Sequence, residues 1–262
     1  MCARAVTRKR DEYVKISINM ATIPSRKVGF EARLNELAPQ CDIFRVYLNG
    51  YSEWPFDIPL YENVEYVCGN NIDAPDMGSQ GKLSFIDPMR EEYYLTVDDD
   101  IYYPPDYVEK IVQGSDLFYK KAIVGFHGIE YKIKNGCSLP IETWNTQTRN
   151  MYMYSEQLPH QKVVHQLGNA TMCCVPCELG LTKDVIGGPI NSGDDSDMAI
   201  WAQQHNVPMV ILRRYRNWLM PDNRVNTIDA QHRQQGRRVM ERDKLHAVQR
   251  WNLPTMPKSK LK

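Results

Sequence analysis

Three consecutive aspartates, Asp98, Asp99 and Asp100, follow the apolar run YYLTV and precede a helical pattern that begins at Pro105. Two carboxylates about 4 Å apart repel each other by on the order of 4 kcal/mol at a surface-like dielectric constant. Capping a helix or favouring a turn needs one aspartate, not three. A divalent cation turns the repulsion into ligation, because carboxylate oxygens are the hard donors that it prefers. The triplet therefore predicts a metal site in the loop between a strand and a helix.

A second acidic segment, GDDSDM, opens another helical pattern with Asp194, Asp195 and Asp197. Carboxylates in a first helical turn can cap the helix and interact favourably with its dipole. A carboxylate in this place can also serve as a general base that takes a proton from a hydroxyl. Both interpretations stay open for each residue, and we expect one of Asp194 and Asp195 to be functional.

Lys82 lies in the glycine-rich segment DMGSQGKLS, which differs from a phosphate-binding loop. That loop needs four residues between its glycines and a Ser or Thr directly after the lysine. Here two residues separate Gly78 from Gly81, and Leu83 follows the lysine. Lys82 either meets a phosphate as a point charge or is an ordinary surface lysine.

Seven cysteines form an odd set in a chain too long to need disulfide bonds, so we expect reduced thiols. The cluster CCVPC does not predict structural zinc, because no second CxxC or histidine pair lies at zinc-finger spacing. On a strand, Cys173 and Cys174 would point to opposite faces of a sheet.

The composition is that of a globular protein, with 42% hydrophobic and 24% charged residues. No stretch approaches the roughly 20 apolar residues of a transmembrane helix, and the basic N-terminus lacks the apolar core of a signal peptide, so we expect a cytoplasmic location.

The 32 basic residues equal the 32 acidic ones, which argues against nucleic acid as a partner. Residues 233–262 are rich in Lys and Arg; they are either a solvated helix face and tail or a peripheral contact with phosphates or an anionic membrane.

The runs VKISINM, IFRVYLN, NVEYVC, YYLTV and AIVGF alternate with helical patterns, which predicts an α/β fold with a mostly parallel central sheet. Ligands of such folds bind in the loops at the carboxyl ends of the strands. Between residues 128 and 180 the runs MYMYS, KVVHQL and ATMCCV predict a small mixed or antiparallel insertion beside that sheet. A helix with Met198, Trp201 and Ala202 on its apolar face, the buried strand VPMVILR and a polar helix over 226–250 complete the prediction.

The order of these motifs over residues 16–213 resembles the nucleotide-sugar glycosyltransferases of GT-A fold. SINMATIPSR resembles the first strand and nucleoside-binding turn of that family, TVDDDIYYPPDYV its Asp-x-Asp motif and GDDSDMAIWAQQHNVPMVILRR its acidic helix start. VHQLGNATMCCVP is similar to the strand pair at the sugar site, although LGNAT lacks the Gly-Thr-Gly pattern of many relatives. The resemblance implies a GT-A-type α/β/α sandwich with a C-terminal helix, in one catalytic domain over 1–262. Its nucleotide-binding half would span about 14–127, its acceptor-binding half about 128–213 and its C-terminal helical extension about 214–262.

For the metal, the resemblance implies Mn²⁺ or Mg²⁺ bound directly by Asp100, with Asp98 on the metal, its water shell or the ribose. Asp99 would lie between them. A C-terminal histidine ligand of the family is not clearly marked here, and His246, His232 and His127 are its candidates. A histidine ligand would favour manganese over magnesium.

For the substrates, the resemblance implies a nucleoside-diphosphate sugar as donor, with a UDP-sugar expected. Asp98, Asp99 and four further residues would approach the nucleotide: Thr22, Arg26, Asp76 and Lys82. Asp195, or Asp194 in a shifted register, would deprotonate a hydroxyl of a glycan or lipid-linked glycan acceptor, and the sugar would be transferred with inversion.

Two other functions fit the same residues. Asp98 and Asp100 also match the nucleophile and the acid/base of haloacid-dehalogenase-like phosphohydrolases, although that motif usually follows the first core strand and here three strand-like runs precede it. A non-catalytic nucleotide-sugar binding module would keep the fold and the metal without turnover.

Overall fold

The computed structural model describes residues 14–51, 61–69, 74–139, 147–186, 193–223, 245–246, 248, 250–256 and 258–259. The polar helix predicted over 226–250 falls almost entirely outside these residues, as do His232 and most of the basic C-terminal region.

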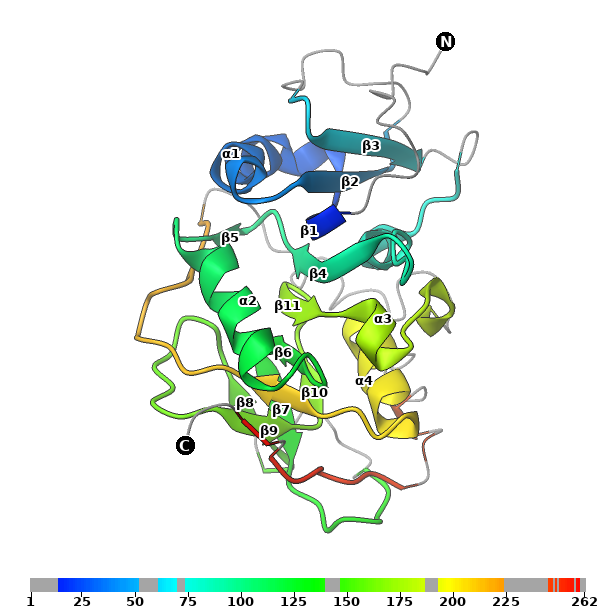
Figure 1. Ribbon diagram of the computed structural model, residues 1–262, viewed down its shortest axis with the longest axis vertical. Coiled ribbons are helices and arrows are strands. Elements are labelled where there is room, and N and C mark those ends of the chain that lie inside the picture. Colours follow the sequence, from blue (N-terminus) through cyan, green and yellow to red (C-terminus); the bar gives the residue numbers. More distant parts are fainter. Residues whose placement is uncertain are drawn as a thin grey trace.

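An eight-stranded sheet in the order β3-β2-β1-β4-β11-β6-β12-β9 forms the centre of the molecule (Figure 1). Neighbours pair in parallel from β3 to β4 and between β6 and β12, whereas β11 is antiparallel to both β4 and β6, and β9 is antiparallel to β12. Parallel pairs are the majority, so the predicted α/β class with a mostly parallel sheet is confirmed. The strands are β1 (Val14–Thr22), β2 (Ile43–Asn49), β3 (Val64–Gly69), β4 (Glu91–Val97), β6 (Ile123–Gly125), β9 (Lys162–Val164), β11 (Thr171–Cys174) and β12 (Met209–Ile211).

Helices cover both faces of the sheet, with α1 and α2 on one face and α3 and α4 on the other (Figure 1). Short 3₁₀ segments flank them. The helices are α1 (Lys27–Leu37), α2 (Tyr107–Leu117), α3 (Pro176–Leu179) and α4 (Asp194–Gln204), and the 3₁₀ segments are η1 (Pro24–Arg26), η2 (Ala38–Gln40), η3 (Gly78–Leu83) and η4 (Lys183–Val185).

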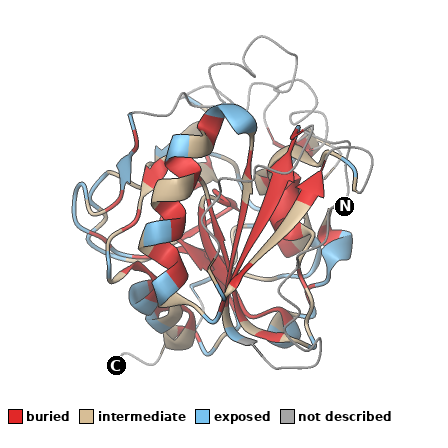
Figure 2. Cartoon of the chain, turned by 90° about the horizontal axis from the view of Figure 1, so that it is seen from above, coloured by how far each residue is buried: buried red, intermediate tan, exposed pale blue. Residues whose placement is uncertain are grey.

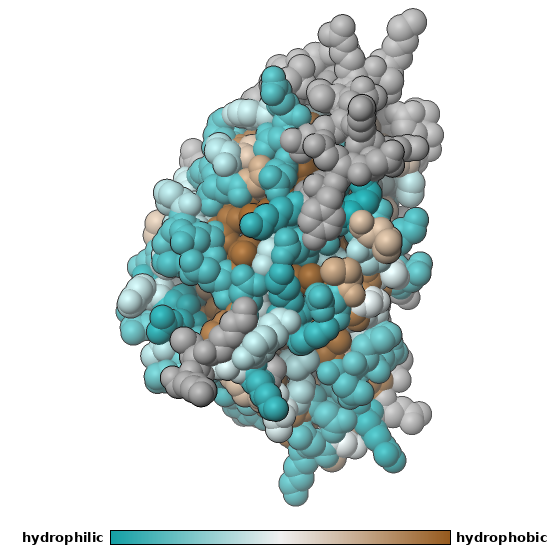
Figure 3. All heavy atoms as spheres, in the orientation of Figure 1, coloured by the Kyte–Doolittle hydropathy of each residue, from teal (hydrophilic) through white to brown (hydrophobic). Residues whose placement is uncertain are grey.

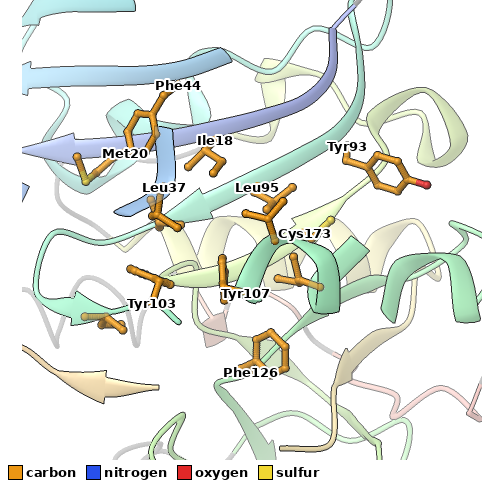
Figure 4. Packing of buried hydrophobic residues seen from close by; sticks show 14 of the residues in the cluster. Ile18, Met20, Leu37, Phe44, Tyr93, Leu95, Tyr103, Tyr107, Phe126 and Cys173 are labelled. Atoms are coloured by element: carbon orange, nitrogen blue, oxygen red, sulfur yellow. The ribbon is translucent and has the colours of Figure 1, made fainter. Parts of the chain in front are cut away.

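The sheet divides the core into two hydrophobic clusters, because successive side chains of a strand point to opposite faces. On β11, Cys173 packs into the cluster under α1 and α2, whereas Met172 and Cys174 pack into the cluster under α4. The first cluster joins Ile18 and Phe126 with other side chains of the sheet and its helices (Figure 4). Seen from above, the strands are buried along most of their length (Figure 2). The opposite orientation predicted for the two neighbouring cysteines is confirmed.

A three-stranded antiparallel sheet, β10-β7-β8, supplies the predicted insertion. It is formed by β7 (Gly128–Tyr131), β8 (Arg149–Tyr152) and β10 (Gln166–Leu167), and a further pair joins β5 (Ile101–Tyr102) to β13 (Met220–Pro221). Two runs predicted to lie beside the main sheet instead belong to it: ATMCCV forms β11, and the start of KVVHQL forms β9. All four residues of β11 are buried, and an apolar strand of this kind requires cover on both faces.

The surface facing the viewer in Figure 3 is mostly hydrophilic, and hydrophobic side chains form small, separate patches on it. Within the described segments, no helix has the length and apolar character needed to cross a membrane.

His165, between β9 and β10, makes the stability of the fold depend on pH. Its Nδ1 atom accepts the backbone N–H of Tyr131 at 3.0 Å, while its Nε2 atom is buried without a hydrogen-bond partner. Burial lowers the pKa of His165 to about 4, against the opposing charge of Glu130. The unfolded chain therefore binds a proton before the folded protein does, and stability falls as the pH drops from about 6.5 to about 4.

We expect His165→Asn, whose amide oxygen can replace the Nδ1 acceptor, to remove this pH dependence. The wild-type protein should lose on the order of 2 kcal/mol more unfolding free energy than the variant between about pH 7 and pH 4. Urea unfolding at both pH values measures the difference, with the exposed His160→Asn as control. Parallel pH profiles of His165→Asn and wild type would contradict the assignment.

Candidate active site

The aspartate triplet lies at the carboxyl end of β4, beside the end of β1. The parallel register of the two strands pairs Met20 with Val97, so Thr22 and Asp99 come together just beyond it. The Thr22 hydroxyl donates a hydrogen bond to Asp99 Oδ2 at 2.7 Å. The predicted position of the triplet after a strand is confirmed, although the two-residue strand β5 lies between the triplet and α2.

Asp99 is the anchor of the triplet. It is fully buried, and its Oδ1 atom lies 2.5 Å from Nη1 of Arg26, whose Nη2 atom donates to Asp100 Oδ2 at 3.0 Å. Burial raises the pKa of Asp99 to about 6, although Arg26 and the Thr22 hydroxyl favour the charged form. Burial alone would lower the pKa of Arg26, but Asp99 and the other two carboxylates outweigh it and raise that pKa. Arg26, predicted to approach the nucleotide, thus holds two of the aspartates in place.

Lys82 joins the two acidic segments. Its buried ammonium group contacts Asp98 Oδ1 and lies 3.3 Å from Asp194 Oδ2. Burial opposes the charge, yet Asp194 and then Asp98 outweigh it and raise the pKa of Lys82. The surface-lysine interpretation is wrong: this lysine is the counter-ion of carboxylates from β4 and α4.

Gly81 allows Lys82 to reach this position. A Cβ atom on Gly81 would lie 2.6 Å from Cγ of Tyr47 on β2, so only a glycine lets η3 pack so closely against the sheet. The hydroxyl of Tyr94, on β4, donates to the Lys82 carbonyl oxygen and fixes the backbone from the other side.

We expect Lys82→Met to destabilise the protein, because it leaves Asp98 and Asp194 without their shared cation. Removing one partner of a buried ion pair costs about 3–5 kcal/mol, and the partial exposure of Asp98 places the expected loss at about 2–4 kcal/mol. Chemical denaturation measures it, with the exposed Lys134→Met as matched control. An unchanged unfolding midpoint would show that the pairing of Lys82 with Asp98 and Asp194 does not stabilise the fold.

The second acidic segment starts α4. The N-cap is Gly193, at φ 101°, which has no side chain to cap the helix. Asp197 is buried and accepts a hydrogen bond from Gln80 Nε2 at 2.7 Å. None of the three carboxylates is the N-cap residue, but all of them lie in the first turn, where the helix dipole favours negative charge, as the structural interpretation expected.

Asn169 binds both remaining carboxylates of that segment. Its backbone N–H donates to Asp195 Oδ1 at 2.7 Å, and its side-chain amide donates to Asp194 Oδ2 at 3.3 Å. Asp194 is buried and paired with Lys82, whereas Asp195 is only partly buried. Asn169 was not predicted as a site residue, even though its segment LGNAT stood out in the sequence.

Asp76 lies in the loop that follows β3. Its Oδ1 atom accepts the Gly78 N–H at 3.0 Å, and Asn49 fixes the same loop by accepting the Met77 N–H at 3.0 Å and donating to the Gly78 carbonyl at 2.8 Å. Asn49 ends β2, so Asp76 is placed at the same edge of the sheet as the triplet. Asn49, too, was missed from the sequence.

Tyr103 is a further residue that sequence reasoning missed. Its hydroxyl accepts the backbone N–H of Asp98 at 2.9 Å and donates to the Ala170 carbonyl at 2.6 Å. It thereby ties the first aspartate of the triplet to the segment that carries Asn169.

The histidines considered as third metal ligands differ in position. His127 follows β6, and its pKa is lowered to about 4 by burial and by Arg214, against the charge of Asp98. His246 has a buried Nε2 atom without a hydrogen-bond partner, and within the described part of the chain its ring makes no hydrogen bond or ion pair with the aspartates. His232 lies outside the described residues. The third ligand, His246 included, stays a prediction.

The carboxylates fit a hard divalent cation. Asp98 and Asp100 each commit one oxygen, to Lys82 and Arg26 respectively, and their side chains stay 32% and 16% exposed. Burial raises the pKa of Asp100, and the neighbouring Asp98 raises it further, against the charges of Arg26 and Lys82. The described residues hold no group of three or more His, Cys, Asp and Glu arranged for a metal. Two carboxylates completed by substrate phosphates and water are a usual set for Mg²⁺.

Comparison with known proteins does not assign an activity. No family model matches the chain, and no curated protein matches it. Its structure is similar to that of 4-diphosphocytidyl-2C-methyl-D-erythritol synthase from Anaerococcus prevotii, with a TM-score of 0.44 and 13% sequence identity over 78% of this chain and 90% of that one. A likeness this distant says nothing about the reaction.

Proposed function

We propose that the protein is a metal-dependent glycosyltransferase that moves a hexosyl group from a nucleoside-diphosphate sugar, with a UDP-sugar as the expected donor, to a hydroxyl of a glycan or lipid-linked glycan. One observation carries the proposal. Lys82 brings the aspartates after β4 and the acidic start of α4, which are far apart in the sequence, into one site. A transferase of this kind needs carboxylates for a cation beside a carboxylate for a base.

On the donor side, Asp98 and Asp100 would hold Mn²⁺ or Mg²⁺. A nucleoside diphosphate brings about two to three negative charges next to these carboxylates, so the site would repel its substrate without a cation. When bound, the metal would act as a Lewis acid on the leaving diphosphate. Thr22 and Arg26 keep the triplet in position through Asp99.

On the acceptor side, Asp195 is the better placed base. Lys82 and burial commit Asp194 to an ion pair, whereas Asp195 is partly exposed and oriented by the Asn169 N–H. Asp195 would take the proton of the acceptor hydroxyl while its oxygen bonds to the anomeric carbon. The bond from that carbon to the diphosphate oxygen breaks, and its electron pair leaves with the diphosphate. A single in-line displacement of this kind inverts the anomeric configuration.

The phosphohydrolase alternative is less well supported. Its nucleophilic aspartate usually follows the first core strand, whereas here the first described strand, β1, ends in Thr22 and the triplet follows β4. A binding module without turnover has the same donor site and differs only in lacking transfer.

A panel of nucleotide-sugars, incubated with the protein in Mn²⁺ or in chelator, tests the proposal. We expect slow metal-dependent hydrolysis of at least one donor, and transfer when an acceptor is added. Phosphate release from a simple phosphomonoester would support the phosphohydrolase instead. Metal-dependent nucleotide binding with no turnover of any donor would support the binding module.

A further inference from the structure

A cleft of about 500 Å³ opens between α2 and the segment that follows β12, with residues 157–161 as its third wall. Figure 1 shows this segment passing beside α2. The volume is within the range of small-molecule sites. No aspartate or glutamate is among the residues that line the cleft, so it is distinct from the acidic site described above.

Arg213 and Arg214 give the cleft positive charge, while Lys110, which also lines it, is paired with Asp106 at 2.6 Å. Arg214 is buried, and its guanidinium group donates to the carbonyl oxygens of Met153, Tyr154 and Leu212. It forms no ion pair with a carboxylate of the described residues. Burial lowers the pKa of Arg214 to about 10, against the opposing charge of Glu156. The neighbouring Arg213 is exposed and has no partner in the described part of the chain.

Aromatic rings and free amides complete the lining. Trp218 is fixed by a hydrogen bond from its indole N–H to Asp106 Oδ1 at 3.1 Å. Its ring centroid lies 4.7 Å from that of Phe126 and 4.6 Å from Lys110 Nζ. Tyr215 is 76% exposed at the same cleft. The side chains of Gln157 and Gln161 make no hydrogen bond with described residues. The flat apolar rings match the apolar faces of a charged sugar chain. The amides, which both donate and accept, match its hydroxyls, and the guanidinium groups match its acidic groups.

Tyr154 connects this cleft with the acidic site. Its carbonyl oxygen accepts from Arg214 Nε at 3.0 Å, and its ring centroid lies 5.8 Å from that of His127. Burial and the charges of Asp100 and Asp98 raise the pKa of Tyr154 to about 12.

We propose that the cleft between α2 and residues 212–218 binds an anionic carbohydrate, whose acidic group meets Arg213 and Arg214 and whose sugar rings stack on Tyr215 and pack beside Trp218. The inference does not depend on the proposed transferase activity, because it concerns binding in the absence of donor and metal.

Isothermal titration of the full chain with a glucuronate-containing tetrasaccharide and a neutral tetrasaccharide of equal length tests this proposal. We expect the anionic probe to bind at least about tenfold more tightly. Arg213→Gln should weaken binding of the anionic probe about fivefold or more, and Tyr215→Ala should weaken both probes. Both side chains are exposed, so these variants spare the fold, unlike a change at the buried Arg214. Arg216→Gln, an exposed arginine that does not line the cleft, should bind like wild type.

Asp100→Asn should also bind the anionic probe normally, which separates this cleft from the proposed donor site. Equal affinity for both probes, or an equal loss in Arg213→Gln and Arg216→Gln, would overturn the proposal. Displacement of the saccharide by inorganic phosphate at equal concentration would show that the cleft binds free anions and does not recognise the sugar. Binding to phosphatidylglycerol vesicles, with no saccharide binding, would identify a membrane surface and not a carbohydrate as the ligand of the cleft.

Discussion

Asp100→Asn is expected to reduce metal-dependent turnover of the donor by about 100-fold or more, since the metal supplies several kcal/mol of charge stabilisation. The amide can still meet Arg26 but no longer offers the charged oxygen that a hard cation requires. Initial rates of sugar release, measured over a range of Mn²⁺ concentrations, give the effect. Excess metal should recover part of the rate if the loss lies in metal affinity.

The matched control is Asp184→Asn, which removes an exposed carboxylate that belongs to neither acidic segment. Its rates should equal those of wild type. Wild-type rates in Asp100→Asn itself would show that the triplet does not serve the reaction, and the metal would then have to be sought elsewhere.

Asp195→Asn is expected to abolish transfer while nucleotide binding stays near normal. General-base catalysis contributes about 10²- to 10⁴-fold, and an amide cannot take the proton of the acceptor. The new side chain keeps an oxygen that can accept the Asn169 N–H, so the start of α4 should remain intact. Transfer rates and titration with the nucleoside diphosphate in Mn²⁺ measure the two effects separately.

Asp194→Asn is the matched variant for this prediction. It weakens the ion pair with Lys82, so we expect lower stability together with retained, though reduced, transfer. The reverse outcome, with transfer lost in Asp194→Asn and kept in Asp195→Asn, would assign the base to Asp194.

Much of the sheet was predictable because its strands are continuous apolar runs. The run IFRVYLN coincides with β2, all seven of whose residues are buried. Even Arg45 within it is buried, where it pairs with Glu91 of β4, a pairing that no local pattern reveals. Strand order was harder to predict: the run ATMCCV was expected to lie beside the main sheet, whereas β11 inserts antiparallel between β4 and β6.

Within the site, the sequence identified the charged residues but not how they are neutralised. Like charges placed side by side imply a counter-charge, yet spacing alone cannot show that it is Lys82 and Arg26 that supply part of it. Asn169 and Asn49 are uncharged, and their roles depend on backbone donors and acceptors that only the fold brings together. Asp99, whose role was the least defined, is the one member of the triplet that is fully buried.

The predicted C-terminal helix, the peripheral membrane contact of the basic region and the cytoplasmic location stay predictions, as do the domain bounds. The first two concern residues that fall largely outside the described part of the chain.

The central claim is that the two acidic segments form one metal-dependent transfer site. Proton NMR of an α-linked nucleotide-sugar with acceptor, followed first in chelator and then after excess Mn²⁺, tests it most directly. We predict that the anomeric signal of the donor stays constant until Mn²⁺ is added and that the first product formed then has the β configuration. Consumption of the donor in chelator, or an α-configured first product, would contradict this account.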